Sequence, residues 1–190
     1  MVNVLSHYGR GIERAIKTPV KVKNLVTNLE ISTMGLWDTG ATGSAITSVA
    51  AKKLGLIPIS MTEVSGVHGT EIVPVYSVVL TLNNENISVP VRVTEGKASS
   101  FSIEGDADIL IGMDIITMGD YSITNFNGRT VMSFRFPSLE TIDYCNEVNE
   151  HNRYLKIHEL NLKKHLPDKC GCGSGKLYKN CHGLSPYHKA

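Results

Sequence analysis

The sequence lacks any segment that would place the protein in a membrane or mark it for export. None of its apolar runs approaches the length of about eighteen residues that a membrane-spanning helix needs. The first residues, MVNVLSHYGRGIERAIK, do not show the basic stretch and apolar block of a secretory signal peptide. Only four cysteines are present, and three lie between positions 170 and 181, which fits reduced thiols better than a disulfide framework. We therefore expect a cytoplasmic protein.

The chain also lacks a strong net charge, an excess of aromatic residues and internal repeats. Its formal net charge is +1, and aromatic residues make up 6% of its 190 residues. An apolar content of 42% is ordinary for a globular protein and excludes wholesale disorder. The charge is uneven, with −5 over residues 1–150 and +6 over residues 151–190. The basic end is interpreted either as a solvated face or as a surface with its own partner.

A β-rich region is predicted from about residue 19 to residue 137. It contains β-branched runs interrupted by turn residues, such as EIVPVYSVVLTL and ISVPVRVTE. The clearest hairpin is expected over residues 121–136, where Asn127 and Gly128 suit the two positive-φ positions of a type I′ turn.

Two short helices are expected within this region. The first is predicted in SAITSVAAKKLGL, with Ser44 or Thr47 as its N-cap and Gly55 as its stop. The second is expected to begin near Asp114, in GMDIITMGD.

The character of the sequence changes after Pro137. Residues 138–166 contain no glycine or proline, and Pro167 ends this stretch, so a helical connector is predicted over 138–167, with a polar interruption around residues 146–152. Residues 168–184 then hold a cluster of cysteine, histidine and glycine. Three parts are therefore expected, over 19–137, 138–167 and 168–184.

The stretch LWDTGATGSAIT, residues 36–47, places one acid between an apolar run and small residues. Leu36 and Trp37 would anchor Asp38 on a buried strand, and the amide of Gly40 can donate to the carboxylate. The hydroxyl of Thr39 can lock the loop across an interface. An acid followed by threonine and glycine also occurs in ordinary turns, so the triplet by itself supports both interpretations.

A second motif, ADILIGMDII, follows about seventy residues later. Asp-Thr-Gly-Ala followed by Ile-Leu-Ile-Gly resembles the retropepsin-like aspartic proteases over roughly residues 20–137, and it looks closest to their soluble bacterial members. The resemblance implies an all-β acid protease barrel with a short helix. It also implies that Asp38, Thr39 and Gly40 form the catalytic motif of an aspartic endopeptidase.

The resemblance assigns roles to two further segments. VSGVHGTEIVPVY lies where the family has its flap, a hairpin that closes over substrate, and its tip would be Gly66, Val67, His68 and Gly69. His68 is interpreted either as a substrate contact or as a plain surface histidine on the tip.

The second motif would support the catalytic loop from behind. Ile111, Gly112 and Asp114 would form that support, although Asp114 can equally be an acid that favours a helix N-terminus. Retroviral members carry an arginine that ties the subunits together where this chain has Met113, so the resemblance implies no such ion pair here.

Counting the motifs predicts an oligomeric state. Aspartic proteases activate water between two carboxylates that share one proton, because close like charges cannot both ionise. This chain has one Asp-Thr-Gly, so two copies of Asp38 would have to meet in a homodimer. Asp108 and Asp114 belong to the supporting region and are not expected to complete the pair within one chain.

The stretch CGCGSGKLYKNCHG predicts a metal site. Cys170, Cys172, Cys181 and His182 supply four ligands, which would close a tetrahedral site for structural Zn²⁺ and leave no open position for catalysis. The stretch resembles the SEC-C motif, a zinc knuckle also found at the tail of the bacterial preprotein translocase motor. That resemblance implies a contact element for a protein or the ribosome.

The sequence therefore predicts a homodimeric aspartic endopeptidase whose zinc knuckle recruits a partner or a protein or peptide substrate. Two alternatives stay open. One is an adaptor that keeps the fold without turnover. The other is a factor associated with the ribosome or nucleic acid, acting through its basic tail.

Overall fold

The structure is a computed structural model that describes residues 1–66, 69–83, 85–97, 101, 106–161 and 168–181. The chain divides into two compact units, Met1–Glu140 and Thr141–Ala190, which are described one at a time. Over the described residues, no helix has both the length and the apolar character that crossing a membrane requires.

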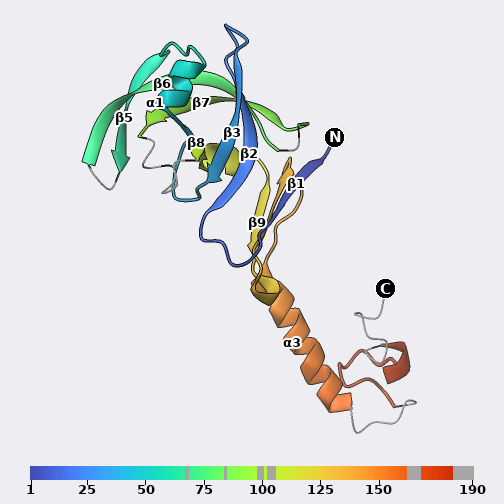
Figure 1. The fold of residues 1–190 in the computed structure, drawn as a ribbon. Coiled ribbons are helices and arrows are strands. Elements are labelled where there is room, and N and C mark those ends of the chain that lie inside the picture. The colour runs from blue at the N-terminus through green and yellow to red at the C-terminus, as the bar shows by residue number, and fades with distance from the viewer. Residues whose placement is uncertain (67–68, 84, 98–100, 102–105, 162–167, 182–190) are drawn as a thin grey trace. The chain divides into compact units, whose positions relative to one another are not determined.

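The first unit consists mainly of strands, as predicted (Figure 1). They are β1 (Asn3–Tyr8), β2 (Ile16–Lys23), β3 (Glu30–Trp37), β4 (Ala45–Thr47), β5 (Ser60–Gly66), β6 (Gly69–Thr81), β7 (Ser88–Gly96), β8 (Ala107–Ile111), β9 (Asp120–Thr124) and β10 (Val131–Phe136). Two short helices, α1 (Ser48–Lys53) and α2 (Met113–Ile116), interrupt them.

Seven of the strands form one sheet in the order β2-β3-β8-β4-β7-β6-β5. The β3–β8 and β4–β7 pairs are parallel, and the others are antiparallel. Because β2 also pairs with β6, the sheet closes on itself and encloses a core. Alternate positions of its strands supply fully buried aliphatic side chains, including Val22, Ile46, Val78, Leu80, Ile109 and Ile111.

The remaining strands form a three-stranded antiparallel sheet in the order β1-β10-β9. It joins the first sheet through aromatic packing, because Trp37 at the end of β3 stacks on Tyr121 of β9 with ring centroids 5.4 Å apart. Phe134 of β10 packs on the same indole at 5.2 Å. Residues 1–18 therefore belong to the first unit, because β1 and the start of β2 take part in its two sheets.

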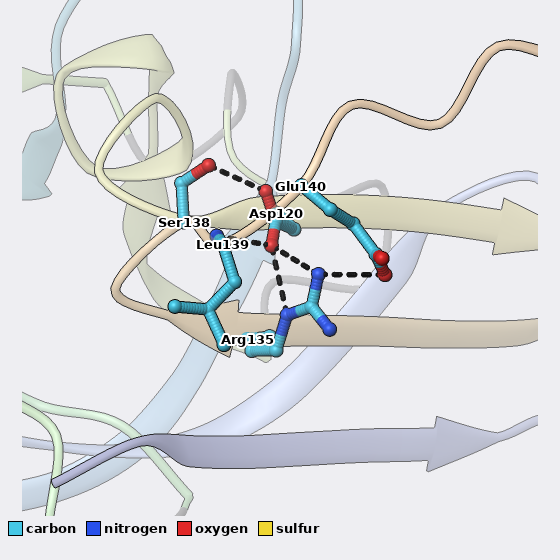
Figure 2. Close-up of polar contacts among 5 residues, drawn as sticks. All are labelled: Asp120, Arg135, Ser138, Leu139 and Glu140. Atoms are coloured by element: carbon cyan, nitrogen blue, oxygen red, sulfur yellow. Dashed lines mark hydrogen bonds and ion pairs between the residues drawn. The ribbon is translucent and has the colours of Figure 1, made fainter.

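A polar cluster holds the end of β10 against β9 (Figure 2). Asp120 accepts hydrogen bonds from Arg135 at 2.8 and 2.6 Å, from the Ser138 hydroxyl at 2.6 Å and from the Leu139 amide at 2.9 Å. Arg135 also pairs with Glu140 at 2.9 Å. The hydrogen bond from Ser138, and after it those from Leu139 and Arg135, lower the pKa of Asp120 to about 2.

The helix predictions are confirmed, with one correction. Thr47 is the N-cap of α1 and its hydroxyl accepts from the Ala50 amide at 3.2 Å, and Gly55 adopts a positive φ of 59° after the helix. The helix starts later than predicted, because Ala45 and Ile46 pair with β8 and β7 as strand β4. The second helix, α2, begins at Met113 beside Asp114, as expected.

The predicted hairpin over residues 121–136 is confirmed as the β9–β10 pair. Asn127 and Gly128 have positive φ values of 53° and 70°, but they lie within a six-residue connection between Thr124 and Val131. A two-residue turn does not form, because the backbone of Thr130 bonds instead to Gly9 and Gly11 of the N-terminal segment.

The second unit begins with a helix, α3 (Tyr144–Asn161). The Asp143 carboxylate accepts from the amides of Cys145 and Asn146 at its N-terminus. The predicted interruption at residues 146–152 is wrong: the helix is continuous there, and its polar side chains are exposed to solvent. Residues 162–167 of the predicted connector lie outside the described residues. Asp168–Cys181 forms a small loop structure with a short 3-10 helix, η3 (Tyr178–Asn180).

Candidate active site and metal site

Asp38 directly follows β3, whose last residue is held firmly. Trp37 is 6% exposed, and its indole Nε1 donates to the hydroxyl of Thr18 at 3.0 Å. Its ring also packs on Tyr121 and Phe134, as described above. The sequence prediction that Trp37 belongs to the core is confirmed. The backbone that leads into Asp38 is therefore fixed by both sheets.

The Asp38 carboxylate lies at the surface end of this strand. Its Oδ1 accepts from the Gly40 amide at 2.8 Å, which is the contact predicted for the Asp-Thr-Gly turn. The Asp38 amide donates to the carbonyl of Ile111 at 2.9 Å. Asp38 is half-buried, whereas Thr39 and Gly40 are exposed. A carboxylate in this position is oriented by the backbone and still reachable from solvent.

The segment Ile111–Asp114 lies against the loop that runs from Asp38 to Ser44. The Met113 amide donates to the carbonyl of Ala41 at 2.8 Å. Gly112 permits a close approach, because a Cβ there would lie 2.6 Å from the carbonyl group of Gly43. Met113 thus contacts the loop through its backbone amide.

The sequence indicates Ser44 only as a candidate helix cap, whereas in the structure it contacts Asp114. Its amide and hydroxyl donate to the Asp114 carboxylate at 3.0 and 2.7 Å. Asp114 also accepts from the amide of Ile115, so it serves its own helix as well. No local pattern in the sequence marks this serine, since its partner lies 70 positions along the chain.

Asp108 was considered as a possible second acid. It lies within β8, where one carboxylate oxygen accepts from the Thr33 hydroxyl at 3.0 Å and the other from the Thr47 hydroxyl at 2.7 Å. Both oxygens thus hold neighbouring strands together. This arrangement favours a structural role over participation in a catalytic pair.

The segment expected to form a flap is an antiparallel hairpin of β5 and β6. Gly66 and Gly69 pair at its end, and Gly69 has a φ of 109°. Val67 and His68, which were predicted at the tip, lie outside the described residues. Two apolar side chains on the arms are well exposed, with Met61 at 58% and Ile72 at 71%.

Three of the four predicted metal ligands come together in the second unit. The sulfur atoms of Cys170, Cys172 and Cys181 all lie within 4.8 Å of one another. The Sγ atoms of Cys172 and Cys181 are 3.6 Å apart, close to the edge of about 3.8 Å expected for a tetrahedral zinc site with Zn–S bonds of about 2.3 Å. These thiols fit a metal ion such as zinc. His182 lies outside the described residues.

The loop around these cysteines has the backbone freedom that such a site needs. Gly173 and Gly175 adopt positive φ values of 78° and 75°. The amide of Cys170 bonds to the Lys176 carbonyl at 2.7 Å. Hydrogen bonds from Ser174 lower the pKa of the Cys172 thiol, whereas burial and the neighbouring cysteines raise the pKa of the Cys181 thiol.

The part of the chain that contains Asp38 is similar to known proteins. The family model described as "Aspartyl protease" matches residues 19–115, just over half of the chain. No curated protein matches the chain. The similar solved structures include a retropepsin-like aspartic protease from Rickettsia conorii, with 16% identity, a TM-score of 0.40, and coverage of 71% of this chain and 95% of that one.

Two viral proteases are also similar. The simian foamy virus protease has 16% identity and a TM-score of 0.37, and the match covers 53% of this chain and 91% of that one. The EIAV protease, solved with the inhibitor HBY-793, has 20% identity and a TM-score of 0.37, with coverage of 55% and 88%. The predicted fold class is confirmed as a mostly β, retropepsin-like fold with a short helix, followed by a helix and a cysteine cluster. By the family match over residues 19–115, the chain belongs to the aspartyl protease family.

Proposed function

We propose that the protein is an aspartic endopeptidase in which Asp38 from each of two subunits forms the catalytic pair. The observation that carries this proposal is the half-buried Asp38 carboxylate at the end of β3, bonded to the Gly40 amide within a chain of the aspartyl protease family. One Asp-Thr-Gly per chain requires a second subunit to supply the partner acid. Retropepsin-like proteases typically act as homodimers on peptide substrates.

The proposed chemistry is hydrolysis by an activated water. The ionised Asp38 takes a proton from water, while the protonated Asp38 of the other subunit donates its proton to the carbonyl oxygen of the peptide. The resulting gem-diol intermediate breaks its C–N bond as the first Asp38 gives the proton taken from water to the leaving nitrogen. One hydroxyl of the intermediate returns a proton to the other Asp38, which yields a carboxylic acid and an amine and restores the pair. The Gly40 amide keeps one oxygen of Asp38 oriented throughout.

The loop and the hairpin have supporting roles in this proposal. The exposed Thr39 would lock the two loops across the dimer interface. The β5–β6 hairpin would act as the flap over substrate, with Gly66, Val67, His68 and Gly69 at its tip. The exposed apolar side chains on its arms favour contact with a peptide that carries apolar residues.

The second unit is proposed to bind zinc and recruit a partner or substrate. Cys170, Cys172 and Cys181 would hold the ion, with His182 as the fourth ligand. Four protein ligands make a structural site, and metal binding would supply folding energy to a segment too small for a core of its own. The zinc ion would therefore take no part in the hydrolysis.

The test is cleavage of a diverse peptide mixture by the full chain, from mildly acid to neutral pH. We expect cleavage by a dimer, as measured by sedimentation, and loss of cleavage in Asp38→Asn. Asp106→Asn is the matched control, because this exposed acid pairs with Lys17 outside the candidate site. A folded dimer that cuts nothing, or an Asp38→Asn variant that still cuts, would contradict the proposal.

The charge asymmetry favours a second candidate function. Residues 151–190 carry a net charge of +6, which suits an adaptor or a factor associated with the ribosome or nucleic acid. Capture of a protein partner that depends on zinc would support the adaptor. Binding to RNA that falls steeply with salt would support the nucleic-acid factor. A cytoplasmic location is proposed in either case, because three of the four cysteines lie in one cluster that suits a metal site better than a disulfide framework.

A further inference from the structure

We propose that Ser44 is a positioning residue for Asp38, because it fixes the far end of the catalytic loop to the Asp114 carboxylate. In the dimer this attachment would set the separation of the two Asp38 carboxylates. The inference rests on the proposed function, and it goes beyond that function by assigning control of the catalytic pair to a buried serine outside the Asp-Thr-Gly motif.

The loop from Asp38 to Ser44 is held at three points by one short segment. At its start, the Asp38 amide donates to the Ile111 carbonyl at 2.9 Å. In its middle, the Ala41 carbonyl accepts from the Met113 amide at 2.8 Å. At its end, Ser44 bonds to Asp114 and to Gly112. Each residue from Ile111 to Asp114 therefore holds the loop.

Ser44 makes the densest of these attachments. Its hydroxyl donates to Asp114 Oδ1 at 2.7 Å and accepts from the Gly112 amide at 3.1 Å, while its own amide donates to Asp114 Oδ2 at 3.0 Å. The residue is 1% exposed, so water cannot replace these bonds without a rearrangement. Removal of the hydroxyl would leave the Gly112 amide without this acceptor and would remove one charge-assisted bond to Asp114.

Both ends of the loop adjoin paired strands, because Trp37 ends β3, Ala45 begins β4, and the Ser44 carbonyl accepts from the Thr94 amide at 3.1 Å. The Ser44 side chain adds the attachment to the segment behind the loop. Trp37 is held by the packing of its ring, so the six residues after Asp38 can move only if the hydrogen bonds that hold them break. A catalytic group has to be held within about 0.5 Å of its productive geometry. Two carboxylates share one proton only while they stay close, since their repulsion falls with distance.

A purely structural role for Asp114 is the competing explanation. Its carboxylate accepts from the Ile115 amide, so it would stabilise the first turn of α2 even without Ser44. That role does not involve the Ser44 hydroxyl, and it predicts no change in how the two acids share a proton. Variants of Ser44, with Asp114 left in place, therefore separate the two explanations.

The experiment compares the full-length Ser44→Ala and Ser44→Thr variants with the wild type. Ser44→Ala is expected to lower kcat by about 10- to 100-fold, as for displacement of a reacting group by up to 1 Å, with KM changed less than about twofold. Its bell-shaped pH profile should narrow, because carboxylates that move apart titrate more independently. Ser44→Thr keeps the hydroxyl and should restore both the rate and the profile.

Thr47→Val is the matched control. Thr47 is also 1% exposed and donates its hydroxyl to an aspartate at 2.7 Å, but that partner is Asp108, which lies in β8 and also accepts from Thr33 of β3. It also caps α1, so its loss should lower stability. We expect Thr47→Val to unfold at a lower urea concentration than the wild type while it keeps the width of the pH profile.

The outcomes separate failure of this inference from failure of the proposed function. If the wild type cleaves peptides and Ser44→Ala keeps the wild-type rate and profile, the inference is wrong and the proposed function stands. If the wild type cleaves nothing, carbon-13 NMR titration of the Asp38 carboxylate replaces the kinetic readout. A titration curve that changes in Ser44→Ala but not in Thr47→Val supports positioning by Ser44, and identical curves in all three overturn it.

Discussion

Replacement of Gly112 by alanine should force the catalytic loop away from the segment behind it. A Cβ at this position would lie 2.6 Å from the carbonyl carbon and oxygen of Gly43, whereas ordinary contacts begin at 3.4 Å. Both neighbouring atoms belong to the backbone, so no side chain can rotate to make room. The two segments would have to separate by about 0.8 Å. Such a shift would break the short bonds that Ser44 makes to Asp114.

The expected losses of stability and of catalytic rate both follow from this displacement. Overpacking of a tight contact lowers the free energy of unfolding by about 1–3 kcal/mol. A misplacement of about 1 Å costs roughly 100-fold in rate, so a shift of about 0.8 Å should lower kcat by roughly 30- to 100-fold if the protein is the proposed protease. Urea unfolding followed by circular dichroism measures the first effect, and initial rates at saturating peptide measure the second.

Gly43→Ala is the matched control for stability. It adds the same methyl group to the other side of the same contact, but a Cβ at Gly43 meets nothing within 4 Å. We expect its unfolding midpoint to stay near that of the wild type. The reasoning is refuted if Gly112→Ala and Gly43→Ala unfold at the same urea concentration, because the close approach would then impose no constraint.

Three further predictions concern the supports of the site and the second unit. Trp37→Phe removes the donor to the buried Thr18 hydroxyl and should lower the free energy of unfolding by about 1–3 kcal/mol in a urea titration; an unchanged midpoint would contradict the anchoring role. Because the pKa of Asp120 is lowered to about 2, its contribution to stability is present above pH 4 and is lost as the pH falls toward 2. The difference in unfolding midpoint between the wild type and Asp120→Asn should accordingly shrink over that range, and a difference that stays constant would count against the cluster in Figure 2. Cys170→Ser should lower the zinc content of the purified full chain, as measured by mass spectrometry of the metal, whereas Cys145→Ser should keep it; equal zinc in both would exclude the proposed site.

The parts of the site that the sequence predicts are those whose chemistry lies within a few neighbouring residues. The bond from the Gly40 amide to Asp38 spans two positions, and the cysteine cluster spans eleven. Local spacing is enough to indicate both. The cap of α1 by Thr47 is equally local, and it was predicted for the same reason.

The parts that were missed depend on pairing between distant strands. Ser44 meets Asp114 across 70 positions, and that contact requires β4 to lie beside β8. The same pairing converts Ala45 and Ile46 from the predicted helix into a strand. Asp120 gains Arg135 through the pairing of β9 with β10, and it gains Ser138 and Leu139 because the chain turns back after β10. The periodicity of apolar residues in helices and strands does not predict these contacts between distant residues.

The closure of the seven-stranded sheet has a mechanical consequence for the β5–β6 hairpin. The pairing of β2 with β6 links six of the strands into a ring, and β5 is left attached to β6 alone. Residues of β6 from Val75 onward pair with β7, whereas the strand partner of the earlier ones, among the residues that the structure describes, is β5. Glu71 in the earlier part also forms an ion pair with Lys97. The two arms can consequently bend together about Val75 without breaking a single ladder bond of the ring. One continuous strand, β6, thus joins the closed ring to the hairpin that the proposed function assigns as the flap.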